Sequence, residues 1–323
     1  MSQSAGKPRY SPVDLSAVRT YSQKQRATKV HGAEVAPSTR LPAPGAMAAE
    51  LFDSLPDYLA AKQFRQLVEA MATAHRAGRN IGVAFGAHLV KVGCGPILVD
   101  LIDRGIVTCI STNGAGAIHD LELALFGATS EDVGANLADG SFGMVTETPA
   151  AFAQILARAA STGRGLGRSV GEFILEQPGA NAAASVFAAA ARAGIPATVS
   201  VAVGTDTIHM HPNIDLAAVG GASGVDFRLL CSFACELGGG VWINAGSAVI
   251  LPEVFLKAVT VARNLGHSLE GLTAANLDMI RHYRPGVNVV GRPVAPGFGV
   301  QITGHHELIW PMIRLAVLER LMK

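Results

Sequence analysis

Short apolar runs alternate along this chain of 323 residues with longer stretches in which apolar residues recur at helical spacing. Runs rich in Val, Ile and Ala predict buried strands, and they lie at 80–86, 106–110, 195–203, 241–244 and 287–290. Strands separated by helices of this length predict an α/β fold, in which helices cover both faces of a doubly wound, mainly parallel sheet.

The stretches between these runs predict helices and loops. A first helix is expected at 46–77, interrupted near Pro56, and later ones at 87–103, 117–126, 149–160, 170–176, 181–193, 225–237, 251–264 and from Glu307 onward. Segments without periodicity predict irregular structure, and they lie at 130–144, 204–212, 272–278 and 297–304.

The stretch Ile106–Gly127 combines a strand, a glycine turn and the start of a helix. Asn113 and Gly114 belong to the turn Asn-Gly-Ala-Gly, where small side chains let a phosphate or a ribose approach the backbone. This order is typical of a dinucleotide site in an open α/β sheet, although the standard GxGxxG motif is missing. A purely structural connection is an equally good interpretation.

Composition and charge exclude several classes of partner. The net charge of +1 gives no reason to expect nucleic acid or an anionic membrane surface. No charge-free apolar run reaches the ~18 residues needed to span a bilayer. The N-terminus lacks the apolar core of a secretory signal, and the four cysteines form no CxxC pair, so we expect a cytoplasmic protein. Residues 1–45 are interpreted as a polar arm and residues 46–323 as one α/β domain.

Segments that follow predicted strands and helices resemble, in order, those of the deoxyhypusine synthase family. TNGAGAIHD resembles TAGGxEED, GTDTIHMH resembles TDGSxGD, a GGG turn follows, and TAANLD resembles TAQEFD. The resemblance implies a Rossmann-like NAD-binding domain and a homotetramer. The cofactor would contact Asn113, Gly114, Asp206, Gly238, Gly239, Gly240, Thr273, Ala274, Asp278, Gly304 and His305.

Departures from this family change the expected substrate. The family forms a covalent intermediate through a lysine, but this chain has no lysine between Lys257 and Lys323. His119, His211 and Arg281 fall on acidic positions that hold the polyamine in the family. Because cationic or neutral groups do not stabilise a buried polycation, we expect a small, anionic, non-polyamine substrate.

The expected activity is NAD-dependent oxidation of a carbon that bears an amine or a hydroxyl. His119, His211 and Arg281 would hold or deprotonate the substrate, since imidazole titrates near neutral pH. Asn244 falls where the family carries a substrate-side histidine, and Arg284 is a further candidate for binding the substrate.

Three alternative functions stay open. NGAGAIHDLELALFG also resembles a segment of archaeal-type ornithine cyclodeaminases, in which case Arg281 or Arg284 would bind an amino-acid carboxylate. A second alternative is a relative that binds a ligand without catalysis. A third is a metal-dependent enzyme that uses His209, His211 and the segment 305–307, although polar-pocket histidines are commoner than metal ligands and no metal is expected.

The carboxylates of the resemblance have a structural alternative as well. Asp206 and Asp278 would accept hydrogen bonds from ribose hydroxyls if the resemblance holds, but aspartate caps helices routinely. The TD context favours the ribose for Asp206, whereas the two interpretations are balanced for Asp278.

Overall fold

A computed structural model describes Ser16, Arg19 and residues 47–322 of the chain, so almost all of the expected arm at 1–45 lies outside the described residues. Six strands form one sheet in the order β3-β2-β1-β4-β5-β6, and each neighbouring pair is parallel. The strands are β1 (Ile81–Phe85), β2 (Cys109–Asn113), β3 (Ala197–Ser200), β4 (Val241–Ala245), β5 (Thr273–Asp278) and β6 (Gly299–Thr303). The predicted α/β fold with a parallel sheet is therefore confirmed.

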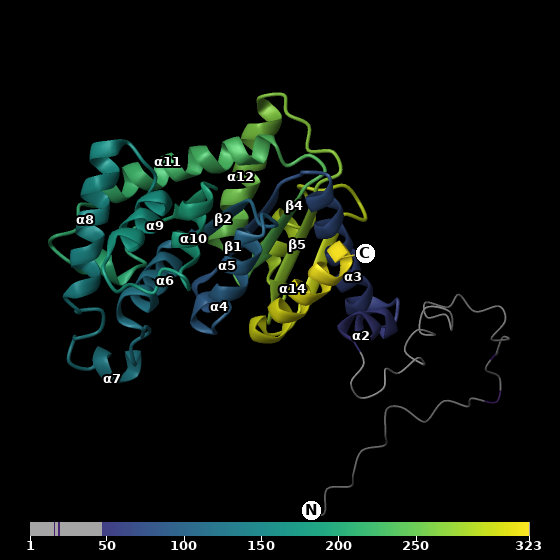
Figure 1. Ribbon diagram of the computed structural model, residues 1–323, viewed down its shortest axis with the longest axis horizontal. Coiled ribbons are helices and arrows are strands. Elements are labelled where there is room, and N and C mark those ends of the chain that lie inside the picture. The colour runs from purple at the N-terminus through teal and green to yellow at the C-terminus, as the bar shows by residue number, and fades with distance from the viewer. Residues whose placement is uncertain (1–15, 17–18, 20–46, 323) are drawn as a thin grey trace, which may run out of the picture.

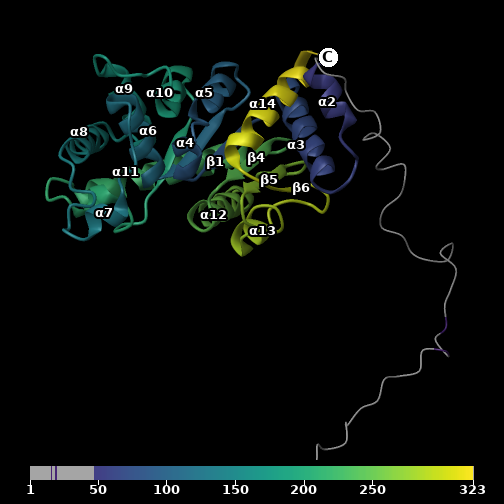
Figure 2. The same ribbon diagram turned by 90° about the horizontal axis from the view of Figure 1, so that it is seen from below.

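Helices pack on both faces of this sheet (Figures 1 and 2). The helices α11 and α12 lie on one side in Figure 2, and α3, α5 and α14 lie on the other. The helices are α2 (Ala48–Ser54), α3 (Leu59–Arg76), α4 (Ala87–Lys91), α5 (Gly95–Asp103), α6 (Gly114–Phe126), α7 (Val133–Leu137), α8 (Glu147–Thr162), α9 (Leu166–Glu176), α10 (Val186–Ala193), α11 (Leu216–Cys235), α12 (Ile250–Asn264), α13 (Tyr283–Asn288) and α14 (His306–Met322). A short 3-10 helix covers Thr207–Met210.

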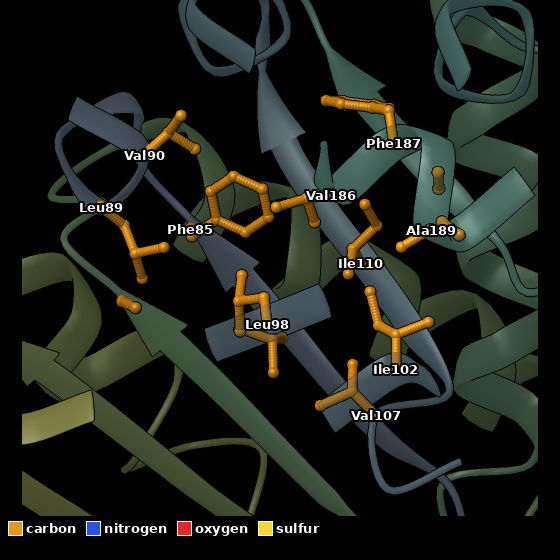
Figure 3. Close-up of a cluster of buried hydrophobic side chains, with 14 of the residues drawn as sticks. Phe85, Leu89, Val90, Leu98, Ile102, Val107, Ile110, Val186, Phe187 and Ala189 are labelled. Carbon is orange, nitrogen blue, oxygen red and sulfur yellow. The ribbon is translucent and has the colours of Figure 1, made fainter. Parts of the chain in front are cut away.

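The two faces of the sheet bury separate apolar clusters, because successive strand residues point to opposite faces. Phe85 of β1 packs with Leu98 of α5 and Val186 of α10 in the larger cluster (Figure 3). On the other face Trp242 of β4 stacks on Phe255 of α12, with ring centroids 4.6 Å apart. Both faces are therefore anchored by large aromatic side chains.

Several predicted elements agree with the structure. The break near Pro56 separates α2 from α3, and β1, β4, α12 and α14 begin within one residue of their expected positions. The helix expected at 87–103 is instead divided into α4 and α5, because Gly93 between them has a φ of +81°. The helix expected at 225–237 starts earlier as α11, and the one expected at 181–193 begins only at Val186.

The strand expected at 106–110 was placed too early. The N–H groups of Ile106 and Val107 bond to the carbonyl of Leu101 and close α5, so β2 begins at Cys109. Its polar residues Ser111 and Thr112 are buried. The Thr112 hydroxyl donates to the carbonyl of Phe85 at 2.7 Å, which compensates its burial.

The expectations for the C-terminal third were wrong in two places. Residues 287–290 were expected as a strand, but α13 extends to Asn288, and the N–H of Val289 caps it by bonding to Pro285. The turn expected at 272–278 is β5, and the glycine-containing segment 297–304 holds β6. Small residues such as Ala274 and Ala275 obscured the strand, since helices cover both of its faces and leave little room there.

Among the described residues α11 is the one helix whose length and composition would let it cross a membrane. It carries Asp226 near its middle and packs against α12, α8 and β3. Core helices of globular proteins pass the same test, so a single such helix is weak evidence for a membrane span.

Candidate functional site

A cavity of about 230 Å³ lies at the edge of the sheet where the strands end. Parallel sheets bind ligands at this carboxyl edge, and the ends of β2 and β3 are neighbours there. The lining combines residues from α4, α6, the segment after α6 and the loop after β3, among them Lys91, His119, Glu122, Glu131, Phe142 and Asp206. A cavity of this size holds several water molecules and therefore has room for a ligand.

Asp206 approaches the cavity from the loop after β3 and lies against the start of α6. The backbone N–H of Ala115, in the first turn of α6, acts on this carboxylate and lowers its pKa. A Cβ added to Gly114 would stand 1.9 Å from Asp206 Oδ2, and one added to Gly116 would stand 2.1 Å from Thr112 Oγ1. Packing against these side chains therefore explains both glycines of the turn without a ligand.

The buried carboxyl group of Asp206 has few hydrogen-bond donors around it. Burial raises the pKa of its carboxyl, while His209 and the N–H of Ala115 oppose the rise. Oδ2 is buried and has no hydrogen-bond partner. The site thus offers an acceptor oxygen that the protein itself does not use.

His209 stands beside Asp206, and backbone hydrogen bonds fix the tautomer of its ring. Its Nδ1 accepts the N–H groups of Gly204 at 3.1 Å and Asp206 at 3.2 Å, so the ring proton is on Nε2. Nε2 lies 3.9 Å from Asp206 Oδ2, too far for a hydrogen bond, and is likewise buried without a partner.

His119 belongs to a chain of hydrogen bonds at the wall of the cavity. Thr129 donates its only hydroxyl proton to Glu122, so its oxygen accepts from His119 Nδ1 at 2.6 Å. Glu122 also accepts from the Thr148 hydroxyl at 2.8 Å. Burial lowers the pKa of His119, and the charge of Lys91 lowers it further against the attraction of Glu122. The ring is therefore neutral at pH 7, with its lone pair on Nε2.

His211 lies outside this chain and serves the loop that closes the cavity. Its Nε2 donates to the carbonyl of Gly143 at 2.7 Å. The N–H of Gly143 in turn donates to Glu131, at 3.2 Å from Oε1 and 3.0 Å from Oε2. His211 thus joins the segment after β3 to the segment before α8 and is not among the residues that line the cavity.

The other substrate residues suggested by the resemblance lie at the ends of β4, β5 and β6. Arg281 Nε donates to the hydroxyl of Thr303 at 3.0 Å, and Arg284 forms an ion pair with Glu253 at 3.3 Å. Asn244 is fully buried, with its amide nitrogen bound to Asn276 at 2.8 Å. Three strand positions separate β2 from β5, which is ~14 Å at the usual strand spacing, so these groups are not brought next to His119.

Three of the cofactor residues suggested by the resemblance lie at the carboxyl ends of β5 and β6. Asp278 is the last residue of β5, and its Oδ1 accepts the N–H of Met279 at 2.7 Å. The N–H of Gly304 bonds to the carbonyl of Asp278 at 3.0 Å. His305 is exposed and lies 3.8 Å from Glu307. All three are at the carboxyl edge, as the resemblance implies, but on the far half of the sheet from Asp206.

The remaining cofactor residues of the resemblance lie at the opposite edge. Gly238, Gly239 and Gly240 precede β4, Thr273 begins β5 and pairs with the carbonyl of Gly240 at 3.0 Å, and Ala274 follows it inside the core. A Cβ on Gly240 would stand 2.3 Å from the carbonyl of Asn80, which explains that glycine structurally. The structure does not bring this group together with Asn113, Gly114 and Asp206.

The histidine pairs do not converge on a common point. His209 Nδ1 receives backbone N–H groups, whereas His211 Nε2 is bound to Gly143. Within residues 47–322 no three His, Cys, Asp or Glu side chains lie together in a way that could hold a metal ion. The alternative of a metal-dependent enzyme therefore finds no support in the part of the chain that the structure describes.

Comparisons with known proteins agree on the fold. No family model matches the chain, and no curated protein matches it. AgrE in complex with L-arginine is similar over 80% of this chain and 32% of its own, with 13% identity and a TM-score of 0.51. This likeness shows the fold alone. The chain spans about a third of AgrE, a protein that has also been crystallised with ornithine and NAD+.

Two further solved structures show weaker likeness. A protein from Methanococcus maripaludis S2 described as LOR/SDH has 16% identity and a TM-score of 0.49, over 83% of this chain and 72% of its own. A protein from Entamoeba histolytica described as a deoxyhypusine synthase has 13% identity and a TM-score of 0.49, over 84% and 92%.

Sequence reasoning missed four of the polar residues around the cavity. Glu122 lies three residues after His119 on α6, so helical spacing already places both on one face. Thr129, which bonds to His119 and Glu122, and Glu131 and Lys91, which line the cavity, carried no comparable signal because all three lie outside α6.

Proposed function

We propose that this protein is an NAD-dependent enzyme that oxidises a carbon bearing an amine or a hydroxyl in a small substrate. The hydrogen-bond chain from His119 through Thr129 to Glu122, at the wall of a cavity on the carboxyl edge, is the observation that carries the proposal. It keeps the proton on Nδ1 and leaves Nε2 as a base.

The chemistry follows from that tautomer. Oxidation removes a hydride from carbon and a proton from the attached oxygen or nitrogen, and NAD, when bound, accepts the hydride. His119 Nε2 takes the proton, and the positive charge that forms on the ring is stabilised by Glu122 through Thr129. Burial keeps the ring neutral until this moment, so the base is available at pH 7.

Two features fit a dinucleotide along this edge. The strand order β3-β2-β1-β4-β5-β6 is the order of dinucleotide-binding sheets, which bind their ligand outside the strand ends. Asp206 Oδ2 is an unused acceptor there, and a ribose hydroxyl could donate to it. Asn113, whose side chain accepts the N–H of Gly116 at 2.9 Å, holds the helix start in place beside it.

A thermal-shift titration with NAD and NADP tests the cofactor. A ligand at a hundredfold excess over its Kd stabilises the folded state by ~2.7 kcal/mol, so we expect the midpoint to rise by several degrees with one of the two. If neither dinucleotide raises the midpoint at saturation, the proposed function is wrong.

Turnover of a panel of small alcohols and amines tests the base. His119→Gln should retain dinucleotide binding but lose ~10²- to 10⁴-fold in kcat. The fall of kcat at low pH, which reports protonation of the base, should be absent in this variant. In the wild type this fall lies below pH 6.5, because burial lowers the pKa of His119. His267→Gln, at an exposed position near the opposite edge, is the control. Equal activity in both variants would refute the role of His119.

The expected homo-oligomer and cytoplasmic location stay predictions. Light scattering on the purified protein measures the oligomeric state. The resemblance to deoxyhypusine synthases implies an oligomer of four chains.

A further inference from the structure

We propose that residues 130–142, between α6 and α8, form a lid that closes over the cavity when a ligand is bound, and that His211 anchors one end of this lid. The inference deepens the proposed function and rests on it for the ligand, because lids exclude water from sites of hydride transfer. The mobility of the segment is argued from its burial, its hydrogen bonds and its backbone.

The segment 130–142 lies outside the core of the protein. It contains α7, which lies at the periphery of the molecule in both views (Figures 1 and 2). None of its residues is buried, and Val133 and Leu137, one turn apart on α7, are 46% and 66% exposed. Packing of an apolar face is what usually holds a short helix in place. The core therefore does not fix α7, and its apolar side chains are available to pack when the lid closes.

The hydrogen bonds of this segment stay within it. Glu131 accepts from Asn136 Nδ2 at 3.1 Å and from the N–H of Gly143. The N–H of Phe142 bonds to the carbonyl of Asn136 at 3.1 Å. Among the described residues, no hydrogen bond of 130–142 reaches beyond Gly143. The segment thus has the internal bonding of a compact loop and moves as one body without losing bonds to the rest of the protein.

The backbone at both ends of the segment suits a hinge. Ser130 has a φ of +72°, which side chains other than glycine rarely adopt, and Gly143 has a φ of +76°. A few residues at the ends of a moving element absorb its change in φ and ψ. Between these two positions, Glu131, Val133 and Phe142 line the cavity, as Ser130 does. Rotation about the two ends therefore moves one wall of the cavity.

The points at which the lid is attached belong to the site. Before the lid, the oxygen of Thr129 accepts from His119 Nδ1 at 2.6 Å. After it, the carbonyl of Gly143 accepts from His211 Nε2 at 2.7 Å. A Cβ on Gly143 would stand 2.9 Å from Cβ of Thr207, so this end packs tightly on the loop after β3. Closure of the lid therefore leaves the base in place, and His211 is a positioning residue of the hinge.

Distances between spin labels on the full-length protein test the lid. One pair is Leu137→Cys on α7 with Val203→Cys in the loop after β3, and both positions are exposed. The control pair replaces the lid position by Ser161→Cys, at the exposed end of α8. Cys235 is the one cysteine that is not buried, so every sample carries Cys235→Ser. Saturating NAD should shorten the lid distance by more than ~2 Å, the size of loop rearrangements on binding, and leave the control distance unchanged.

The anchor is tested with the same labels. His211→Ala removes the hydrogen bond to Gly143, so the distribution of lid distances without NAD should become wider. His267→Ala, at an exposed position near the opposite edge of the sheet, is the control and should leave the distribution as it is. Equal widths in the wild type and His211→Ala would show that His211 does not anchor the lid.

The outcomes separate the lid from the proposed function. Shortening of the lid distance alone supports the lid. A lid distribution as narrow as that of the control pair, and unchanged by NAD that raises the midpoint of thermal unfolding, overturns it. If NAD does not raise this midpoint, the proposed function fails and the distributions without NAD decide. A lid distribution wider than the control then supports the moving segment, and one of equal width overturns it.

Discussion

Asp226 gives the sharpest test of the electrostatics of this fold. Its carboxylate lies inside the protein between α11, the start of α9 and β3, and Oδ2 accepts the N–H groups of Gly167 and Val199, both at 2.9 Å. A Cβ on Gly165 would stand 1.8 Å from Oδ1, so the side chain has no room to turn away. Burial raises the pKa of this carboxyl from 3.8 to about 7, although the two N–H donors oppose the rise.

The sign of the effect on stability follows from the direction of the shift. Because the folded protein binds this proton more tightly than the unfolded chain, the contribution to stability is complete below pH 3.8 and is lost as the pH rises through 7. One pKa unit corresponds to ~1.4 kcal/mol, so about 2 kcal/mol of the free energy of unfolding should disappear between roughly pH 5.5 and pH 8.

Replacing Asp226 by Asn removes the titration and keeps the shape of the side chain. Urea unfolding is measured at roughly pH 5.5 and pH 8. Between these two pH values, the free energy of unfolding of the wild type should fall by about 2 kcal/mol relative to that of Asp226→Asn. Asp57→Asn, at a side chain that is 53% exposed, should follow the wild type. A difference between wild type and Asp226→Asn that is the same at both pH values would refute the buried, proton-binding carboxyl.

Three further substitutions test packing around the sheet. Gly114→Ala places a methyl group against Asp206 and should destabilise the protein by ~1–3 kcal/mol. In Gly220→Ala, in α11, the added methyl group meets no atom within 4 Å, so this variant should be more stable by ~0.5–1 kcal/mol. Urea unfolding in which the two variants change the free energy of unfolding in the same direction would contradict this. Phe255→Ala removes the partner stacked on Trp242 and should cost ~3–5 kcal/mol, and a loss below ~1 kcal/mol in thermal unfolding would show that the site repacks.

The hydrophobic pattern of the sequence determined the α/β alternation and the elements with strong local signals. The break near Pro56, β1, β4 and α12 are confirmed, because burial and periodicity are properties of neighbouring residues. Where a strand consists of small or polar residues, as in β5 and the end of β2, the local pattern failed. Their burial is set by helices from distant parts of the chain.

Only the tertiary structure decided which residues meet. The chain crosses the sheet so that β2 and β3 end side by side, and Asp206 therefore packs against Gly114, 92 residues earlier in the numbering. Because all six strands are parallel, Gly238, Gly239 and Gly240, which precede β4, lie at the opposite end of the strands, although the sequence alone suggested one common site. Lys91 reaches the cavity because α4 packs on α6. Order and direction of strands depend on long-range packing, which a local pattern does not encode.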